Sequence, residues 1–348
     1  MKNKAKLQRF SMRAFLWLCG FQLICFSPFF LAAQEEPSAR ILPVAEFQQA
    51  RAIAVTPLGE IFVLDGALSR LYKLDPTGKK LAHVGGFGID REAFDMPLDL
   101  TTDGLNVFIA DRGNQRISQF DRYLNFVTLL QNRPTPLVPF GTISEPTNSA
   151  SQLWRPISVS ILGQGDLYIL DEAQRQVIRI NPLTFAAEIQ QRQNPNQFQF
   201  GGFDAGAGNL IEPRCLQTSR SGKIFVADVG RNAVVVYDMF GNYVTELGKG
   251  WFKALKGLGA GLVPPTVESR PDLQEWLVVV DESALFFFHT EPHTGFKFFG
   301  KCLKSDLELL IGSRVSSLSD AAILNETLYL LTENALYLLP LRQLKLVQ

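Results

Sequence analysis

Short apolar runs recur along the chain, and each is followed by a polar turn and then by residues that alternate between apolar and polar. The clearest copy begins at Val107 and reads V-F-I-A-D-R-G-N-Q-R-I-S-Q-F-D. Runs of β-branched and aromatic residues bounded by Gly, Asn and Asp are typical of antiparallel strands. No segment beyond residue 33 shows a long helical period. The pattern therefore predicts an all-β chain.

Comparison of the chain with itself shows six copies of this pattern, two of them degenerate. The residues that follow the first apolar run of each copy are Asp65, Asp111, Asp171, Asp228, Asp281 and Thr332. A short strand is expected before each run, as at residues 52–55, and a weaker fourth strand closes the copy, as at residues 243–247. Four strands repeated six times predict a six-bladed β-propeller of four-stranded antiparallel blades.

The copy around Asp111 resembles the NHL repeat of six-bladed propellers. Here D-R-G-N-Q-R-I follows G-G-F-G at residues 85–88 and F-D-M-P at residues 94–97. The match is good in the copies of Asp111 and Asp228, fair in those of Asp65 and Asp171, and poor in the last two. The resemblance covers nearly all of the chain beyond residue 33 and implies a propeller of the TolB-like superfamily. Such repeats specify a fold strongly and a function hardly at all.

The sixth copy is short of an outer strand, because the chain nearly ends after residue 339. An open sheet edge invites pairing with other chains, so a closed ring needs this strand from elsewhere. Residues 40–47, R-I-L-P-V-A-E-F, precede the first full copy and have strand character. We expect this segment to complete the last blade and close the ring.

The first 33 residues differ from the rest. Five basic residues precede an apolar run from Ala14 to Phe30, and small residues end the segment at Ala33. This order is typical of a secretory signal cleaved after Ala33, with an uncleaved membrane anchor as the alternative. We therefore expect a single propeller domain at residues 34–348, exported to the periplasm or outside the cell, and touching a membrane only through an uncleaved N-terminal segment.

Charge and cysteine content narrow the class of partner. The formal charge of the chain is zero, but five of its 34 basic residues lie in the first 33, which leaves 29 against 34 acidic residues and a net charge of −5 beyond them. No basic patch stands out, so nucleic-acid binding is not expected. Cys215 and Cys302 are either two separate thiols or one disulfide, which an exported location permits. A monomer is expected.

The aspartates that end the second strands are interpreted as turn formers, together with Asn114 and Asn232. Their carboxylates can bond to turn backbone, and Gly113 is expected to supply a positive φ. The alternative is an acidic ring that holds a cation, but residues set back on second strands would diverge too far for one ion. No cofactor is expected, although a calcium ion at the axis is left open.

Three long segments vary between the copies, at residues 131–152, 190–208 and 248–265. We expect them to be crossovers on one face of the ring, and long loops on a rigid scaffold are the usual carriers of binding. The candidate contact residues are Trp251, Phe252, Lys253, Phe198, Phe200 and Trp154. The alternative is that Trp251 and Phe252 tuck onto the edge of a blade.

Histidine is too scarce for much metal chemistry. The chain has His83, His289 and His293, and Pro292 interrupts the last pair, so helical zinc geometry is not expected. No G-x-S-x-G elbow, P-loop or Rossmann fingerprint occurs in a suitable context. We expect a non-enzymatic scaffold that binds a protein, peptide or glycan through the crossovers. A metal-dependent hydrolase or lyase with its site at the central channel is the alternative.

Overall fold

The computed structural model describes residues 41–131, 154–162, 165–185, 198–263, 274–291 and 295–348. The chain divides into two compact units, Met1–Ala39 and Arg40–Gln348, and the described residues all belong to the second. The predicted signal or anchor segment therefore lies outside the described residues. In the part of the chain that the structure describes, no helix is long and apolar enough to cross a membrane.

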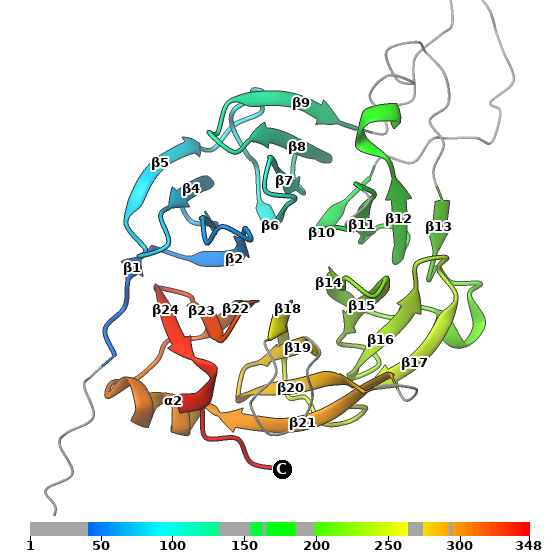
Figure 1. Cartoon of the computed structure of the whole chain (residues 1–348). Coiled ribbons are helices and arrows are strands. Elements are labelled where there is room, and N and C mark those ends of the chain that lie inside the picture. Colours follow the sequence, from blue (N-terminus) through cyan, green and yellow to red (C-terminus); the bar gives the residue numbers. More distant parts are fainter. Residues whose placement is uncertain (1–40, 132–153, 163–164, 186–197, 264–273, 292–294) are drawn as a thin grey trace, which may run out of the picture. The chain divides into compact units, whose positions relative to one another are not determined.

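Six four-stranded antiparallel sheets follow one another around a ring, as predicted (Figure 1). Blade 1 contains β2 (Ala50–Val55), β3 (Ile61–Asp65), β4 (Arg70–Leu74) and β5 (Lys80–Gly85). Blade 2 contains β6 (Pro97–Thr102), β7 (Asn106–Asp111), β8 (Arg116–Asp121) and β9 (Phe126–Leu130). Blade 3 contains β10 (Pro156–Ile161), β11 (Leu167–Asp171), β12 (Gln176–Ile180) and β13 (Phe198–Phe200).

The remaining three blades continue the series. Blade 4 contains β14 (Pro213–Thr218), β15 (Lys223–Asp228), β16 (Ala233–Asp238) and β17 (Tyr243–Leu247). Blade 5 has longer strands, β18 (Leu255–Val263), β19 (Gln274–Asp281), β20 (Ala284–Glu291) and β21 (Gly295–Leu303). Blade 6 contains β22 (Leu318–Leu324), β23 (Thr327–Thr332) and β24 (Ala335–Pro340). Short helices occur outside the blades, and they are η1 (Gly206–Gly208), α2 (Lys304–Ile311) and η2 (Leu341–Gln343).

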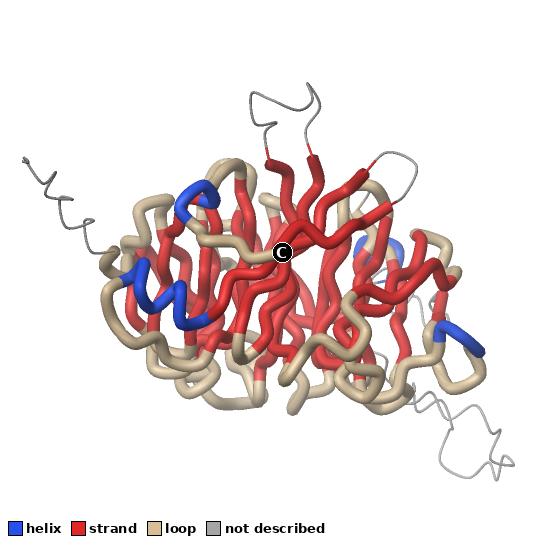
Figure 2. Tube along the Cα trace, turned by 90° about the horizontal axis from the view of Figure 1, so that it is seen from below, coloured by secondary structure: helices blue, strands red, loops and turns tan. Residues whose placement is uncertain are grey.

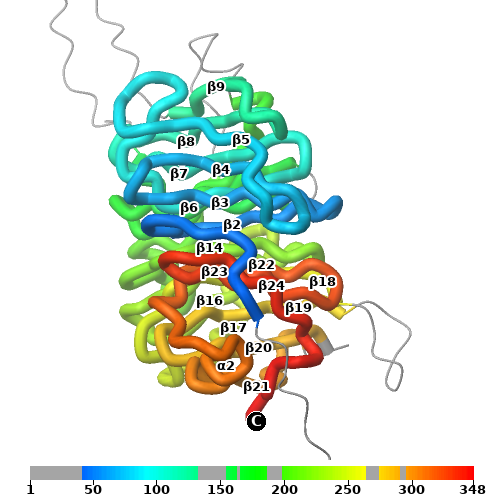
Figure 3. The backbone as a smooth tube through the Cα atoms, turned by 90° about the vertical axis from the view of Figure 1, so that its left-hand side faces the viewer, coloured from blue at the N-terminus to red at the C-terminus, as the bar shows by residue number. Residues whose placement is uncertain are grey.

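The outer strand of blade 6 comes from the start of the described chain, which confirms the predicted closure. Strand β1 (Ala45–Glu46) pairs with β24, and Figure 3 shows the blue segment beside the red one. The Phe47 N–H donates to the Asn334 carbonyl at 2.8 Å, and the Phe47 ring is buried between blades 6 and 1. The pairing is shorter than the predicted segment, but it joins the two ends of the propeller.

The core consists of apolar layers between neighbouring blades. In blade 5, Leu285 and Phe287 pack toward blade 6, whereas Phe286 and Phe288 pack toward blade 4. All four side chains are buried. The unbroken apolar run at residues 285–288 therefore marks a strand that is covered on both of its faces, as expected for a sheet packed between two others.

The strands run between two faces on which the turns gather (Figure 2). We call the crossover face the end that holds the connections between blades, such as residues 86–96 and 201–212, and the turns between second and third strands. We call the hairpin face the opposite end, which holds the turns between first and second strands, such as residues 219–222. Each inner strand begins at the crossover face with a register shift between its first and third residues.

Two of the three long segments are not the crossovers that the sequence suggested. Because β13 is the outer strand of blade 3, residues 201–212 alone form the connection to blade 4. Residues 248–254 form the next crossover, and most of the rest of segment 248–265 is the inner strand β18. Segment 131–152 lies outside the described residues apart from its first residue.

The prediction placed the glycines of β18 in a long crossover loop. In the structure they lie in a strand, where they allow close packing against the next blade. Gly257, Gly259 and Gly261 alternate along the side of β18 that faces β22. A Cβ atom on Gly259 would lie 2.2 Å from the Ala321 carbonyl oxygen, and one on Gly261 would lie 2.2 Å from the Ile323 oxygen. The inner strands of blades 5 and 6 therefore lie backbone against backbone, which a side chain would prevent.

Candidate functional site

The main candidate site is a cavity of about 740 Å³ at the crossover face, which we call the crossover cavity. It is lined by the first residues of all six inner strands and by neighbouring turns, so it forms the mouth of the central channel. Its charged lining residues are Arg51, Asp99, Glu172, Arg175, Glu212, Arg214, Lys253, Lys256, Asp320 and Glu333. Five cationic and five acidic side chains thus converge on one opening.

The cationic side chains of the cavity lack ion-pair partners in the described part of the chain, although the Arg51 guanidinium donates a hydrogen bond to Gln49 Oε1 at 3.1 Å. In the described part of the chain, none of the five lies within ion-pair distance of an acidic side chain. Arg51 and Arg214 come from the opposite blades 1 and 4. Burial, followed by the charge of Arg214, lowers the pKa of Arg51, and Glu333 opposes this shift. Two guanidinium groups that repel each other across a cavity favour an anionic ligand between them.

Three of the five acidic side chains, by contrast, already have partners, namely Glu172, Asp99 and Asp320. The Glu172 carboxylate lies 2.7 Å from the Arg112 guanidinium of blade 2. Asp99 accepts hydrogen bonds from the Leu100 N–H at 2.8 Å and from the Val159 N–H at 3.0 Å. Desolvation raises its pKa to about 6, against the pull of these bonds. Burial also raises the pKa of Asp320, and because a raised pKa favours the neutral acid, Asp99 and Asp320 cancel less of the positive charge than two ionised carboxylates would.

A ring of equivalent positions lies just below the mouth, at the third residue of each inner strand. It consists of Ala52, Asp99, Ser158, Cys215, Gly257 and Asp320. Three of these side chains tie one blade to the next. Asp320 accepts the Ile53 N–H at 3.0 Å, Asp99 accepts that of Val159, and Ser158 accepts the Leu216 N–H at 2.9 Å. The ring is a structural belt around the channel.

Cys215 completes this ring but is a poor nucleophile. Its pKa is raised by desolvation first and then by the charges of Asp320 and Asp99. A thiol that holds its proton reacts slowly. Cys215 and Cys302 are both free thiols, so the two remain separate.

The described residues offer no assembled metal centre. Among them, no three His, Cys, Asp or Glu side chains gather closely enough to hold an ion. His83 lies in the outer strand β5 beside Tyr72, and His289 lies in β20 beside Trp276 and Phe299. Neither lines the crossover cavity, and His293 lies outside the described residues.

The aspartates that end the second strands bond to the chain entering their own blade. Asp111 accepts the Asp95 N–H at 2.8 Å, and Asp228 accepts that of Ile211 at 2.7 Å. Equivalent bonds at Asp65, Asp171 and Asp281 come from Gln48, Arg155 and Lys253. Each of these aspartates also accepts a hydrogen bond from its own turn. In Asp111 the donor is the side-chain amide of Asn114, at 2.7 Å. They lie at the ends of second strands, behind the inner strands that line the channel.

The two asparagines hold neighbouring crossovers. Asn114 donates to the Gly88 carbonyl, and Asn232 exchanges two hydrogen bonds with the Phe252 backbone. The expected role of Gly113 is wrong, because the positive φ of that turn lies at Gln115. Gly113 is needed for space instead, since a Cβ atom there would meet the Asp95 carbonyl oxygen at 2.7 Å.

The structure places the two residues of the predicted contact pair, Trp251 and Phe252, in different environments. Phe252 is 5% exposed and belongs to the core between blades 4 and 5. Trp251 is 49% exposed and lies edge-on to Phe298, with ring centroids 4.9 Å apart. Both rings therefore pack on the edge of the blade, as in the alternative interpretation, and the buried Phe252 offers no surface to a partner. Lys253 lines the crossover cavity.

The other three predicted contact residues lie apart from this cavity. Trp154 is buried and stacks on Phe185 at 5.1 Å, where it supports blade 3. Phe198 is partly exposed on β13, and its neighbour Phe200 packs against Tyr237 at 5.0 Å. The structure therefore does not bring Trp154, Phe198 and Phe200 together with Lys253.

Sequence reasoning missed Arg51, Arg214 and Lys256, although a signal for them was present. Aligning the inner strands by their register places all three at the second residue, inside the shift that begins each strand. Such bulges turn a side chain away from the regular sheet direction. A cationic residue at the same bulge in blades 1, 4 and 5 is visible in the sequence once the repeats are aligned at this position.

Comparison with models of protein families and with curated proteins finds no match. The NHL resemblance therefore remains a resemblance. Among solved structures, the chain is similar to a structural genomics protein of unknown function from Bacteroides thetaiotaomicron VPI-5482, with a TM-score of 0.52, 12% identity, and coverage of 86% of this chain and 71% of that one. At this identity the similarity concerns the propeller fold alone.

Two lyase structures are similar at a lower score. Streptogramin B lyase gives a TM-score of 0.49 at 10% identity, covering 87% of this chain and 99% of that one. Virginiamycin B lyase from Staphylococcus aureus gives 0.49 at 9% identity, covering 85% and 97%.

Proposed function

We propose that this propeller is a non-enzymatic binding scaffold that holds an acidic segment of a peptide or protein partner in the crossover cavity. The observation that carries the proposal is the convergence of five cationic side chains, without ion-pair partners among the described residues, on a cavity of about 740 Å³. Ligand sites of about 300–1,000 Å³ are typical for compact ligands and short chain segments. The expected export of the chain would bring it partners in the cell envelope or outside the cell.

The lining favours a peptide over a glycan. Sugar rings are commonly held by aromatic side chains that stack on their apolar faces, and no aromatic residue lines the described part of this cavity. Carboxylates, in contrast, accept paired hydrogen bonds from a guanidinium, and Arg51 and Arg214 offer two such groups. An extended acidic segment presents several carboxylates to the five cations.

The channel residues support a scaffold over a hydrolase or lyase. Asp99 and Asp320 use their oxygens to hold backbone N–H groups of neighbouring blades. The Cys215 thiol keeps its proton. These side chains serve to hold the ring together, which leaves the cationic residues above them to contact a ligand.

The test compares ligand classes. Labelled peptides of equal length, one acidic, one neutral and one basic, are titrated with the purified chain, and binding is followed by fluorescence anisotropy. We expect the acidic peptide alone to bind, and to bind more weakly as salt is raised from about 0.05 to about 0.5 M, because exposed charges are then screened. Equal binding of the basic or neutral peptide would refute the proposal, as would displacement of the acidic peptide by a neutral oligosaccharide.

A further inference from the structure

A second, smaller cavity of about 160 Å³ lies at the hairpin face, at the other end of the central channel. It is lined by the last residues of the inner strands, whereas the crossover cavity is lined by their first residues. The two sites share no lining residue, so a ligand in the hairpin cavity does not depend on the function proposed for the crossover cavity.

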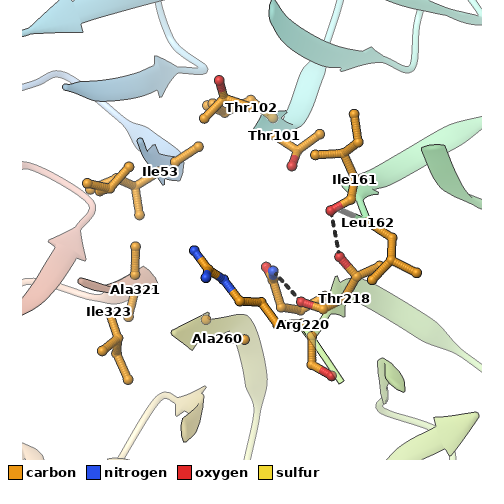
Figure 4. A pocket seen from close by; sticks show the side chains of 17 residues that line it. Ile53, Thr101, Thr102, Ile161, Leu162, Thr218, Arg220, Ala260, Ala321 and Ile323 are labelled. Carbon is orange, nitrogen blue, oxygen red and sulfur yellow. Dashed lines mark hydrogen bonds between the residues drawn. The ribbon is translucent and has the colours of Figure 1, made fainter. Parts of the chain in front are cut away.

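Arg220 dominates the charge of this hairpin cavity. Its side chain reaches from the turn after β14 toward the middle of the opening (Figure 4). Within the described part of the chain, no acidic residue lines the cavity, and the guanidinium has no hydrogen-bond or ion-pair partner. The turn is anchored from outside, because the Arg220 N–H donates to the Glu275 carboxylate of blade 5. A fixed backbone therefore presents to the cavity one guanidinium that has no direct ion-pair partner in the described part of the chain.

The wall of the hairpin cavity is polar where it meets the opening. Backbone groups along an antiparallel edge point outward at every second residue. The Ile53 N–H donates to Asp320 of the neighbouring blade 6, so Val55, two residues further along β2, presents its backbone groups on the same side of the strand. The Val159 N–H reaches Asp99, so Ile161 does likewise. These edges provide backbone N–H donors and, at Val55, a carbonyl acceptor around Arg220, since the Ile161 carbonyl already accepts from Thr218.

Most side-chain hydroxyls of the cavity are already engaged. Thr218 Oγ1 donates to the Ile161 carbonyl at 2.9 Å, as Figure 4 shows, and Thr102 Oγ1 donates to the Asn106 carbonyl at 2.7 Å. The guanidinium, the backbone edges and the polar side chains of Thr101 and Gln217 are left to contact a ligand. A guanidinium binds a carboxylate through two parallel N–H···O bonds, and one cation matches one negative charge.

We propose that the hairpin cavity binds a small hydroxycarboxylate, with its carboxylate on Arg220 and its hydroxyls on the inner-strand backbone. A cavity of about 160 Å³ has room for about five groups of the size of water, each with a share of about 30 Å³. A monoanion with about five to seven non-hydrogen atoms, such as glycerate, is the matching size. The hydroxyls distinguish it from an apolar carboxylate, and the single charge distinguishes it from phosphate.

The experiment uses ligand-observed NMR with the purified chain and four probes, namely glycerate, butyrate, inorganic phosphate and glycerol. We expect glycerate to bind best, with a dissociation constant of about 1 mM, which is reasonable for a ligand of this size. Arg220→Gln should weaken glycerate at least about tenfold, and Arg220→Lys should fall between, because an ammonium lacks the planar fork of donors. The matched control is Arg342→Gln, since Arg342 lies after β24 and lines neither cavity.

Several results would overturn the proposal. Equal binding of glycerate to wild type and Arg220→Gln would remove the role of the guanidinium. Stronger binding of butyrate would contradict the polar wall, and stronger binding of phosphate would contradict the single charge. Arg220 is exposed at the cavity mouth, so its variants should keep the melting temperature of wild type.

Discussion

The substitution Gly259→Ala tests the close approach of blades 5 and 6. The added Cβ atom would lie 2.2 Å from the Ala321 carbonyl oxygen and 3.0 Å from a Val278 methyl group. An ordinary contact needs about 1 Å more, so β18 and β22 must separate or one must bend. Overpacking of this kind costs about 1–3 kcal/mol, and it is offset by about 0.4–1 kcal/mol because alanine restricts the unfolded chain.

We therefore expect Gly259→Ala to lower the free energy of unfolding by about 2 kcal/mol, measured by urea denaturation followed through tryptophan fluorescence. The control is Gly202→Ala, where the nearest atom would lie 3.7 Å from the new Cβ in ordinary contact. The control should leave stability within about 0.5 kcal/mol of wild type, as surface substitutions usually do. If Gly259→Ala is as stable as Gly202→Ala, the backbone-to-backbone packing described for β18 is incorrect.

Three further predictions concern the ring and its turns. Deleting residues 34–48 should lower the melting temperature by more than about 10 °C, because β1 and Phe47 are lost from blade 6; unchanged melting would contradict the closure. Asp111→Ala should cost about 3–5 kcal/mol in a urea titration because it leaves the buried Arg116 charge without its partner, whereas Asp75→Ala, in an exposed turn, should stay close to wild type. The raised pKa of Asp99, about 6, means that its contribution to stability is full below pH about 4 and is lost as pH rises through 6. Wild type should thus lose up to about 2 kcal/mol relative to Asp99→Ser between pH 4 and 8, and a pH-independent difference would contradict the shift.

The fold was predictable because each blade repeats the same local chemistry. Apolar runs such as that at Val107 mark buried second strands, and the six copies fix the number of blades. The closure by residues 40–47 followed from counting strands. Blade 5 was harder to interpret, because Gly257, Gly259 and Gly261 look like a loop in sequence, and their role depends on the distance to another blade.

The candidate site was predicted less well, for a physical reason. Aromatic residues in variable segments attract attention as contact residues, yet Phe252 and Trp154 are buried because large apolar side chains gain more from core packing than from exposure. Arg51 and Arg214 are far apart in sequence, and only the closure of the ring brings them to one cavity. Of the predicted contact residues, Lys253 lies at that cavity.

The most direct test of the account is the affinity of one acidic peptide for wild type and for the double variant Arg51→Gln, Arg214→Gln, with Arg342→Gln as the control. Hydrogen bonds to charged groups contribute about 1.5–3 kcal/mol each, so losing both guanidinium groups should weaken binding by about 100-fold or more. The control should bind as wild type does, and all three proteins should melt at similar temperatures. Unchanged affinity of a folded double variant would show that the acidic segment does not bind in the crossover cavity.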